Sequence, residues 1–246
     1  MRNHEKVQGM QQGKKIILLW SLVFCGFFLQ AVPAFPAETL TVQSPGAKNW
    51  ELKRDRDNIQ VYTRKVPDSP YAAVRVVSVL ENIRLSALVA LIRDAPACSQ
   101  WADKCAESYV YERLSEQEAL VYTHNAMPFP VKDRDVLARS SWQQDEVSGV
   151  VMMHSVATQD IMPEVKGRLR LTDAEASWIF TPLPSGAVEV VNEAHIDPGS
   201  ALPGWVTNML LVDTPFSTMK ALTEAVYRPE YRDAIVDFIK DKVPGI

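Results

Sequence analysis

The four histidines are the first residues to test for catalytic or metal-binding roles. His4, His124, His154 and His195 lie in separate segments of the chain. The sequence has no His-Glu-x-x-His or Cys-x-x-Cys pattern, which would bring several ligands to one zinc ion. It also lacks the Gly-x-Ser-x-Gly, P-loop and Gly-x-Gly-x-x-Gly patterns of hydrolases and nucleotide-binding proteins. The sequence therefore predicts no metal site, no cofactor and no catalytic set.

Cys98 and Cys105 can form a disulfide only if the helix before them has ended. On one continuous helix their Cα atoms would lie about 10 Å apart at 1.5 Å per residue, beyond the ~7 Å limit for bridging. Pro96 indicates that the helix has ended, which allows a bridge. The alternative is a pair of free buried thiols. Closing so short a loop would stabilise the protein by roughly 2–3 kcal/mol.

The N-terminal segment has the composition of an export signal. Lys14 and Lys15 precede a long apolar run, and Val-Pro-Ala ending at Ala34 offers the small residues that a signal peptidase prefers. We expect residues 1–34 to be a cleaved signal peptide and residues 35–246 to be a single domain, periplasmic or secreted. The apolar run is near the minimum length for spanning a bilayer, so an inner-membrane anchor is the alternative.

The charge of the exported domain argues against nucleic acid as a partner. Cleavage after Ala34 removes four of the 26 basic residues and one of the 30 acidic residues, leaving 22 and 29 and a net charge of −7. Such a domain gains little from phosphate backbones or anionic lipid headgroups through bulk charge. We expect any lipid partner to be bound by its apolar part.

Changes of hydrophobic period divide the domain into strands and one early helix. Residues 50–81 indicate three strands rich in Val and Tyr, and residues 84–96 have the spacing of an amphipathic helix. Residues 109–196 return to a period of two, with turns too short for helical crossovers. This stretch predicts an antiparallel meander.

The C-terminal third changes period once more. Residues 198–231 show an apolar repeat near 3.5 residues, which indicates a long helix that Pro215 should kink. A last short helix around residues 231–239 is expected on the outside. Strands followed by a long helix on one side of the sheet predict the α+β class, with a concavity between sheet and helix.

Two prolines interrupt the strand pattern at Pro128 and Pro130. Neither can donate a ladder hydrogen bond, so the strand must be bulged or at an edge there. Arg134 and Asp135 follow within a charged cluster. One interpretation is a solvated turn. In the other, Arg134 turns back to pair with an acid or a carbonyl and pins the bend.

This segment, Met-Pro-Phe-Pro-Val-Lys-Asp-Arg-Asp-Val-Leu, resembles a motif of the START (StAR-related lipid-transfer) domain family. A tryptophan-bearing strand, a hairpin and a strand ending in Asp-Pro-Gly, residues 176–199, resemble the same family, as does the helical segment 200–222. The resemblance runs from about Trp50 to Tyr227.

The resemblance implies the helix-grip fold of the Bet v 1-like superfamily. In that fold a bent antiparallel sheet wraps a long C-terminal helix around an apolar tunnel that holds one lipid. The resemblance implies no catalytic residue, and it gives the motif from Pro128 to Asp135 an architectural role.

Strand faces and the helix stripe supply the candidate ligand-binding residues. Alternate residues on each strand give a mostly apolar inner face with one or two polar groups, as expected for a pocket of about 300–1,000 Å³. For any single candidate, ordinary core is the favoured explanation, with its polar groups satisfied by neighbours. The candidates are Trp142, Met152, His154, Asn192, Trp205, Met209 and Phe216.

We therefore expect a protein that binds one lipid or other hydrophobic small molecule, for transport or sensing, with transient membrane contact. Two alternatives stay open. One is a cavity-based enzyme like the cyclases of the superfamily, with His154 as general base and Asn192 as oxyanion donor. The other is a membrane-anchored interaction module that keeps its signal.

Overall fold

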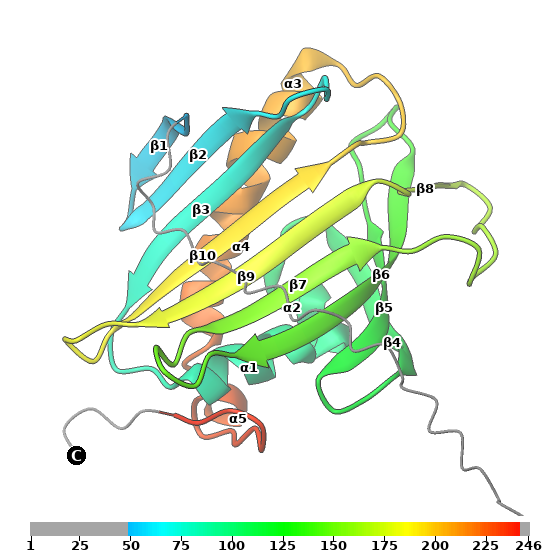
Figure 1. Ribbon diagram of the computed structural model, residues 1–246. Helices are drawn as coiled ribbons and strands as arrows, with labels where there is room; N and C mark the ends of the chain where they lie inside the picture. The colour runs from blue at the N-terminus through cyan, green and yellow to red at the C-terminus, as the bar shows by residue number, and fades with distance from the viewer. Residues whose placement is uncertain (1–48, 242–246) are drawn as a thin grey trace, which may run out of the picture. The chain divides into compact units, whose positions relative to one another are not determined.

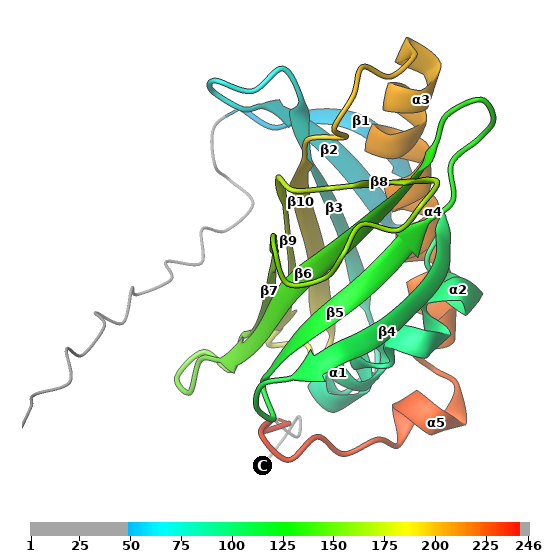
Figure 2. The ribbon, with the colours of Figure 1, turned by 90° about the vertical axis from the view of Figure 1, so that its right-hand side faces the viewer.

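One antiparallel sheet carries the fold of residues 49–241, the part of the chain that the computed structural model describes (Figure 1). The strands are, in order across the sheet, β1 (Glu51–Arg56), β2 (Ile59–Lys65), β3 (Ala72–Leu80), β10 (Val188–Ile196), β9 (Ala174–Pro182), β7 (Val151–Ala157), β6 (Asp133–Gln144), β5 (Glu118–Asn125) and β4 (Cys105–Arg113). Figure 2 shows β4 and β5 facing the reader while β9 and β10 are nearly edge-on, so the sheet is strongly curved. The expected signal peptide, residues 1–34, lies outside the described residues.

The predicted meander holds for every strand from β4 to β10 except β8 (Arg168–Arg170). This three-residue strand pairs with β6 in parallel, where an antiparallel strand was expected. The reason is a second, smaller core on the other face of the sheet, where Leu120, Tyr122 and Leu137 are buried. Met162 and Val165, from the long β7–β8 connection, cover this core, and the connection brings β8 back beside the start of β6.

Three short helical segments follow the first strands. Helix α1 (Leu85–Arg93) is followed by a 3₁₀ turn (Ala95–Ala97) and by the single helical turn α2 (Cys98–Trp101). The helix therefore ends before Pro96, as its sequence position predicts, because the residue before a proline avoids helical geometry.

The long C-terminal helix runs from α3 (Gly204–Asn208) through a π-helical turn (Met209–Asp213) into α4 (Thr214–Ala225). Pro215 has no N–H to donate to a carbonyl one turn earlier, and the wider π turn lies directly before it. The sequence predicted a kink at Pro215, and the structure has a π turn next to it. None of the helices between residues 49 and 241 is long and apolar enough to cross a bilayer.

The main core lies between α4 and the concave face of the sheet. Phe216, Met219, Leu222 and Val226 are buried there, and α4 packs against β2 and β3. This arrangement confirms the expected α+β architecture, in which a curved sheet wraps a long C-terminal helix.

The expected final helix over residues 231–239 is wrong in its length and its place. Helix α5 (Pro229–Arg232) is one turn long, and Asp233 leaves helical geometry. A longer helix would have put Tyr231, Ile235 and Ile239 on one face, but Ile235 is 80% exposed. The chain instead buries Tyr231 and Ile239 in the main core by an irregular path.

Replacing Leu222 by alanine tests whether α4 is the central element of this core. Leu222 is fully buried, so L222A should lower the free energy of unfolding by about 2–5 kcal/mol. Glu224→Ala, on the exposed side of the same helix, should change it by about 0.5 kcal/mol or less. Urea unfolding of the two variants measures both values. Equal effects would contradict the packing described.

Candidate ligand-binding cavity

A cavity of about 250 Å³ lies between the concave face of β4–β7 and the segment from α1 to α2. Its volume is below the range expected from the sequence, which was about 300–1,000 Å³. Helix α4 packs on β2 and β3, toward the other end of the sheet, so α4 does not fill this half. The cavity therefore lies where the segment from α1 to α2, and not α4, is opposite the sheet.

Small side chains on the strands make this half of the sheet hollow. One row across the sheet pairs Val110, Val121 and Ala138, and another pairs Ser140 with Ala119 on one side and Ser155 on the other. All six side chains line the cavity: Val110, Ala119, Val121, Ala138, Ser140 and Ser155. None is long enough to reach the helical layer opposite, so the space between the two layers stays open.

Large rings border the cavity on the side toward the main core. Trp142 and Trp178 lie on one row of the same face, on either side of Met153. Trp101 from α2 packs edge-on against Trp178 with ring centroids 6.5 Å apart. Trp142 and Trp178 also belong to the main core. The rings thus separate the hollow half of the sheet from the packed half.

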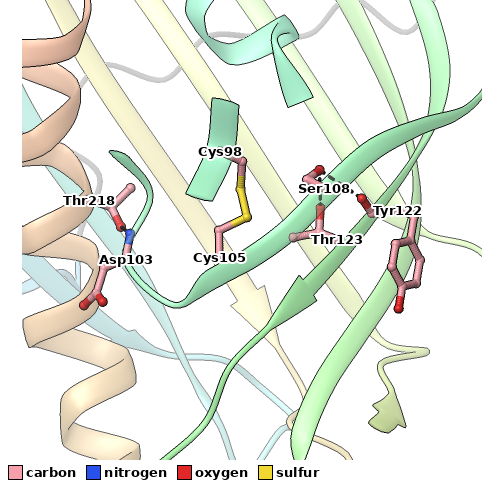
Figure 3. The surroundings of a disulfide bond; sticks show 7 residues. All are labelled: Cys98, Asp103, Cys105, Ser108, Tyr122, Thr123 and Thr218. Atoms are coloured by element: carbon pink, nitrogen blue, oxygen red, sulfur yellow. Dashed lines mark hydrogen bonds between the residues drawn. A yellow bond between two sulfur atoms is a disulfide. The ribbon is translucent and has the colours of Figure 1, made fainter. Parts of the chain in front are cut away.

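The polar groups of the strand wall are hydroxyls that already bond to one another. Ser140 Oγ lies 2.9 Å from Ser155 Oγ, and Ser108 Oγ lies 3.1 Å from Thr123 Oγ1. Figure 3 shows the second pair beside the disulfide, where Ser108 also donates to the Tyr122 carbonyl at 2.9 Å. Because these hydroxyls satisfy each other, the wall can face an apolar ligand without leaving a buried polar group unpaired.

Charged residues line the cavity only at one end. They come from the C-terminal end of α1 and from the β4–β5 turn, and they are Arg93, Asp94, Arg113, Glu116 and Glu118. We call this set the rim. The rim and the uncharged wall give the cavity an ionic end and an apolar interior.

Of the residues predicted to bind ligand, only Trp142 lines this cavity. The inward placement of Met152 and His154 is wrong. Strand β7 turns Val151, Met153 and Ser155 inward, and its two faces are almost equally apolar in sequence, so alternation alone could not choose between them. His154 lies on the outer face, with Nδ1 3.2 Å from Ser177 Oγ and Nε2 3.6 Å from a Glu175 oxygen.

The other four candidates lie away from the cavity lining. Asn192 donates to the Ser177 carbonyl at 3.1 Å, Trp205 is 57% exposed on α3, and Met209 is in the π turn. Phe216 is buried in the main core beneath the guanidinium of Arg54, 4.9 Å from its ring centroid. The sequence showed a buried helix stripe but not which half of the sheet it covers.

Several lining residues were missed by sequence reasoning. Ser108, Thr123 and Ser155 looked like ordinary strand residues, and the helical segment carrying Cys98 and Trp101 was not considered. The available signal was the run of small residues on alternate positions of β5 and β6, which a filled core would not favour.

A disulfide links Cys98 of α2 to Cys105 at the start of β4, with their Cα atoms 6.0 Å apart (Figure 3). The break in the helix at Pro96 brings them this close. In the same loop, the Asp103 amide donates to Thr218 Oγ1 of α4 at 3.0 Å. Since Cys98 lines the cavity, these two links hold one side of the cavity wall in place.

The proline motif forms the bend between β5 and β6, and the Phe129–Pro130 bond is cis. Arg134 is buried and donates to the carbonyls of Lys132 and Pro198 and, at 3.1 Å, to Ser200 Oγ. Of the two interpretations, the one in which Arg134 turns back to carbonyls describes the structure. Arg134 thereby joins the bend to the loop between β10 and α3.

Asp135 is the most deeply buried charge of the motif. It accepts two hydrogen bonds from Arg170 of β8, at 2.9 and 3.2 Å, and one from the Tyr122 hydroxyl at 2.9 Å. Burial is the first cause that raises the pKa of Tyr122. The ion pair holds β8 against β6.

A curved antiparallel sheet that grips a long C-terminal helix and leaves a cavity beside it defines the helix-grip class of proteins. The START domain family model matches residues 38–232. The chain therefore belongs to the START domain family, and the resemblance noted in its motifs is confirmed.

Individual proteins agree with this assignment. The uncharacterized protein PA1579 of Pseudomonas aeruginosa is 32% identical over 182 residues, which cover 73% of this chain and 87% of that protein. The bovine phosphatidylcholine transfer protein is 25% identical over 162 residues, covering 65% and 75% of the two chains.

Two solved structures are similar in fold. A STAR-related lipid transfer protein from Xanthomonas axonopodis superposes with a TM-score of 0.67 at 30% identity, covering 73% of this chain and 99% of that one. Human STARD10 superposes with a TM-score of 0.64 at 19% identity, covering 74% of each. The match to STARD10 supports the fold alone.

Breaking the buried ion pair between Arg170 and Asp135 should lower the free energy of unfolding far more than breaking an exposed ion pair. Arg170→Met leaves Asp135 buried without a cation, so the free energy of unfolding should fall by about 3–5 kcal/mol. Arg139→Met removes the exposed pair with Glu118 and should cost about 0–1 kcal/mol. Denaturant unfolding of both variants provides the measurement. A small effect of R170M would show that the pair does not hold the bend.

Proposed function

We propose that the protein binds one lipid or other hydrophobic small molecule in the cavity beside α1 and α2, and carries or presents it in the compartment that an export signal would reach. The observation that carries the proposal is the wall of small, uncharged side chains on β4–β7. Such a wall offers contact area without reacting groups, which suits binding more than catalysis.

The ligand's apolar surface would supply most of the binding energy. Each methylene group moved from water into the cavity contributes about 0.8 kcal/mol. Association costs on the order of 4–15 kcal/mol in lost freedom, so a small ligand should bind reversibly and not permanently. Reversible binding is what a carrier or a sensor needs. The similarity to two proteins named for lipid transfer supports this class of ligand.

The placement of the candidate catalytic residues favours binding over an enzymatic role. His154 lies on the outer face of β7, and Asn192 is bonded to the Ser177 carbonyl, so the two do not meet in the cavity. A general base must reach the reacting atom within hydrogen-bond distance. We therefore assign His154 and Asn192 no catalytic step.

Transient membrane contact would involve the end of the molecule near the proline bend. Phe129, at this bend, is 94% exposed, and Trp205 of α3 is 57% exposed. Figures 1 and 2 place the bend and α3 at the same end, and Arg134 links the bend to the loop before α3. Exposed aromatic side chains of this kind insert into the interfacial region of bilayers.

Filling the cavity tests the binding proposal directly. Ala138→Phe places a ring in the hollow, so the affinity for a fluorescent fatty-acyl probe should fall at least tenfold. Met152→Phe, on the outer face of the neighbouring strand, adds a similar ring and should leave affinity unchanged. Native mass spectrometry after mild extraction would show whether a lipid co-purifies with the wild type but not with A138F. Unchanged binding by A138F would refute this site.

Removing the exposed aromatic ring tests the membrane contact. Phe129→Ser should weaken binding to phosphatidylcholine vesicles about tenfold, because one inserted Phe side chain supplies roughly 1.4 kcal/mol or more. Ile235→Ser, an exposed apolar residue after α5, is the matched control and should have no effect. Vesicle flotation measures both variants. A similar loss in both would point to nonspecific adsorption.

A further inference from the structure

The rim of the cavity carries two arginines that have no acidic partner in contact. Within residues 49–241, neither Arg93 nor Arg113 forms an ion pair within 4 Å, and the side chain of Arg113 makes no hydrogen bond to another residue. Arg93 donates to the Glu116 carbonyl at 2.9 Å, and its guanidinium lies over the Phe238 ring at 5.0 Å. Arg113 is exposed and Arg93 is partly buried, so most donors of the two guanidinium groups are bonded to no protein group and can turn to a ligand.

A β-bulge places Arg113 at the cavity. The pairing of β4 with β5 shifts by one residue between Val110 and Glu112, so that Arg113 faces Ala119. Ala119 lines the cavity, whereas Leu120, opposite Glu112, is buried in the small core on the other face. Without the extra residue, Glu112 would have taken the position that Arg113 now occupies. The bulge thus brings a cation to the rim in place of an acid.

The two arginines are close enough to repel each other. Burial is the largest cause that lowers the pKa of Arg93, and the charge of Arg113 is the next, against an opposing effect of Glu116. Two like charges held together at the edge of an apolar cavity would be stabilised by an anion between them.

The acids of the rim are mostly engaged elsewhere. Glu118 pairs with Arg139, and Asp94 accepts a hydrogen bond from the Tyr231 hydroxyl at 2.8 Å. Burial, with the bond to Asp94, raises the pKa of Tyr231 to about 12, so this hydroxyl stays protonated. Among the rim acids, Glu116 is the one whose side chain has no hydrogen-bond or ion-pair partner within residues 49–241, so it competes most directly with a bound anion.

The size of the cavity limits the apolar part of the ligand. A volume of about 250 Å³ equals that of roughly eight water molecules in the liquid, at about 30 Å³ each. A methylene group is of comparable size, so the cavity takes one chain of about eight to ten carbons. Two long acyl chains exceed this volume.

We propose that the ligand is a single-chain amphiphile with an anionic head, and that Arg93 and Arg113 hold its carboxylate or phosphate at the rim while its chain lies along the wall of β4–β7. The proposal rests on the proposed function, since it uses the same cavity. It adds the charge of the head, the number of chains and the direction in which the ligand lies.

Three ligands of equal chain length test the charge of the head. Decanoate carries a carboxylate, decyl phosphate carries a phosphate, and decanol carries neither. At pH 7.5 the purified protein should bind at least one of the two anions about tenfold more tightly than decanol, as measured by displacement of a fluorescent fatty-acyl probe. Comparing the two anions identifies which head is held. The difference from decanol should shrink at high salt.

Single substitutions at the rim test the residues. Arg113→Gln should weaken binding of the preferred anion about tenfold and leave decanol unchanged. Glu116→Gln should strengthen anion binding severalfold, because it removes the competing charge. Lys166→Gln makes the same charge change at an exposed residue outside the cavity lining and should alter nothing. Thermal unfolding of each variant checks that it folds like the wild type.

The outcomes distinguish this inference from the proposed function. Equal affinities for all three ligands, unaffected by R113Q, would overturn the anionic head and leave the lipid-binding cavity standing. Failure of all three ligands and of the probe to bind would overturn both. Tighter binding of an anion that R113Q does not weaken would also overturn the inference, because the head would then lie elsewhere.

Discussion

The architecture depends on one constraint, which is that a single long helix cannot cover the whole concave face of a sheet this wide. Helix α4 packs against β2 and β3, where large aliphatic side chains meet it, whereas the cavity wall of β4–β7 lies opposite α1, α2 and the turn between them. Close packing there would need long side chains on the strands. Between the charged rim and the Trp142 ring, these strands carry Ala, Ser, Thr and Val instead, so this half stays hollow.

Buried charges hold the geometry around this hollow. Asp135 and Arg170 form a pair that is almost fully enclosed, and Arg134 bonds to two carbonyls and a hydroxyl. Such groups rarely add net stability over apolar residues of the same shape, because removing them from water is costly. Their geometry is directional, however, and fixes which strand lies against which. Gly199 contributes as well, since its φ of +75° is one that residues with a side chain rarely adopt, and a Cβ there would press on the Leu169 side chain of β8.

The fold could be predicted from the sequence because the hydrophobic period and the positions of the prolines determine it. The strands, the early helix and the irregularity before Pro215 follow from local pattern, and the bend at Pro128 follows from missing donors. The residues that line the cavity could not be predicted in the same way. Both faces of β7 are similarly apolar, and nothing in the pattern of β4 marks the bulge that redirects Arg113. These features depend on pairing between strands, which local spacing does not encode.

The bonds of Arg134 have a consequence for how this end of the molecule can move. One guanidinium bridges the proline bend and the loop that leads into α3, so neither segment can swing outward alone without stranding buried donors. The two loops are therefore mechanically coupled. We expect local opening at this end to be cooperative, so that both segments detach together or neither does.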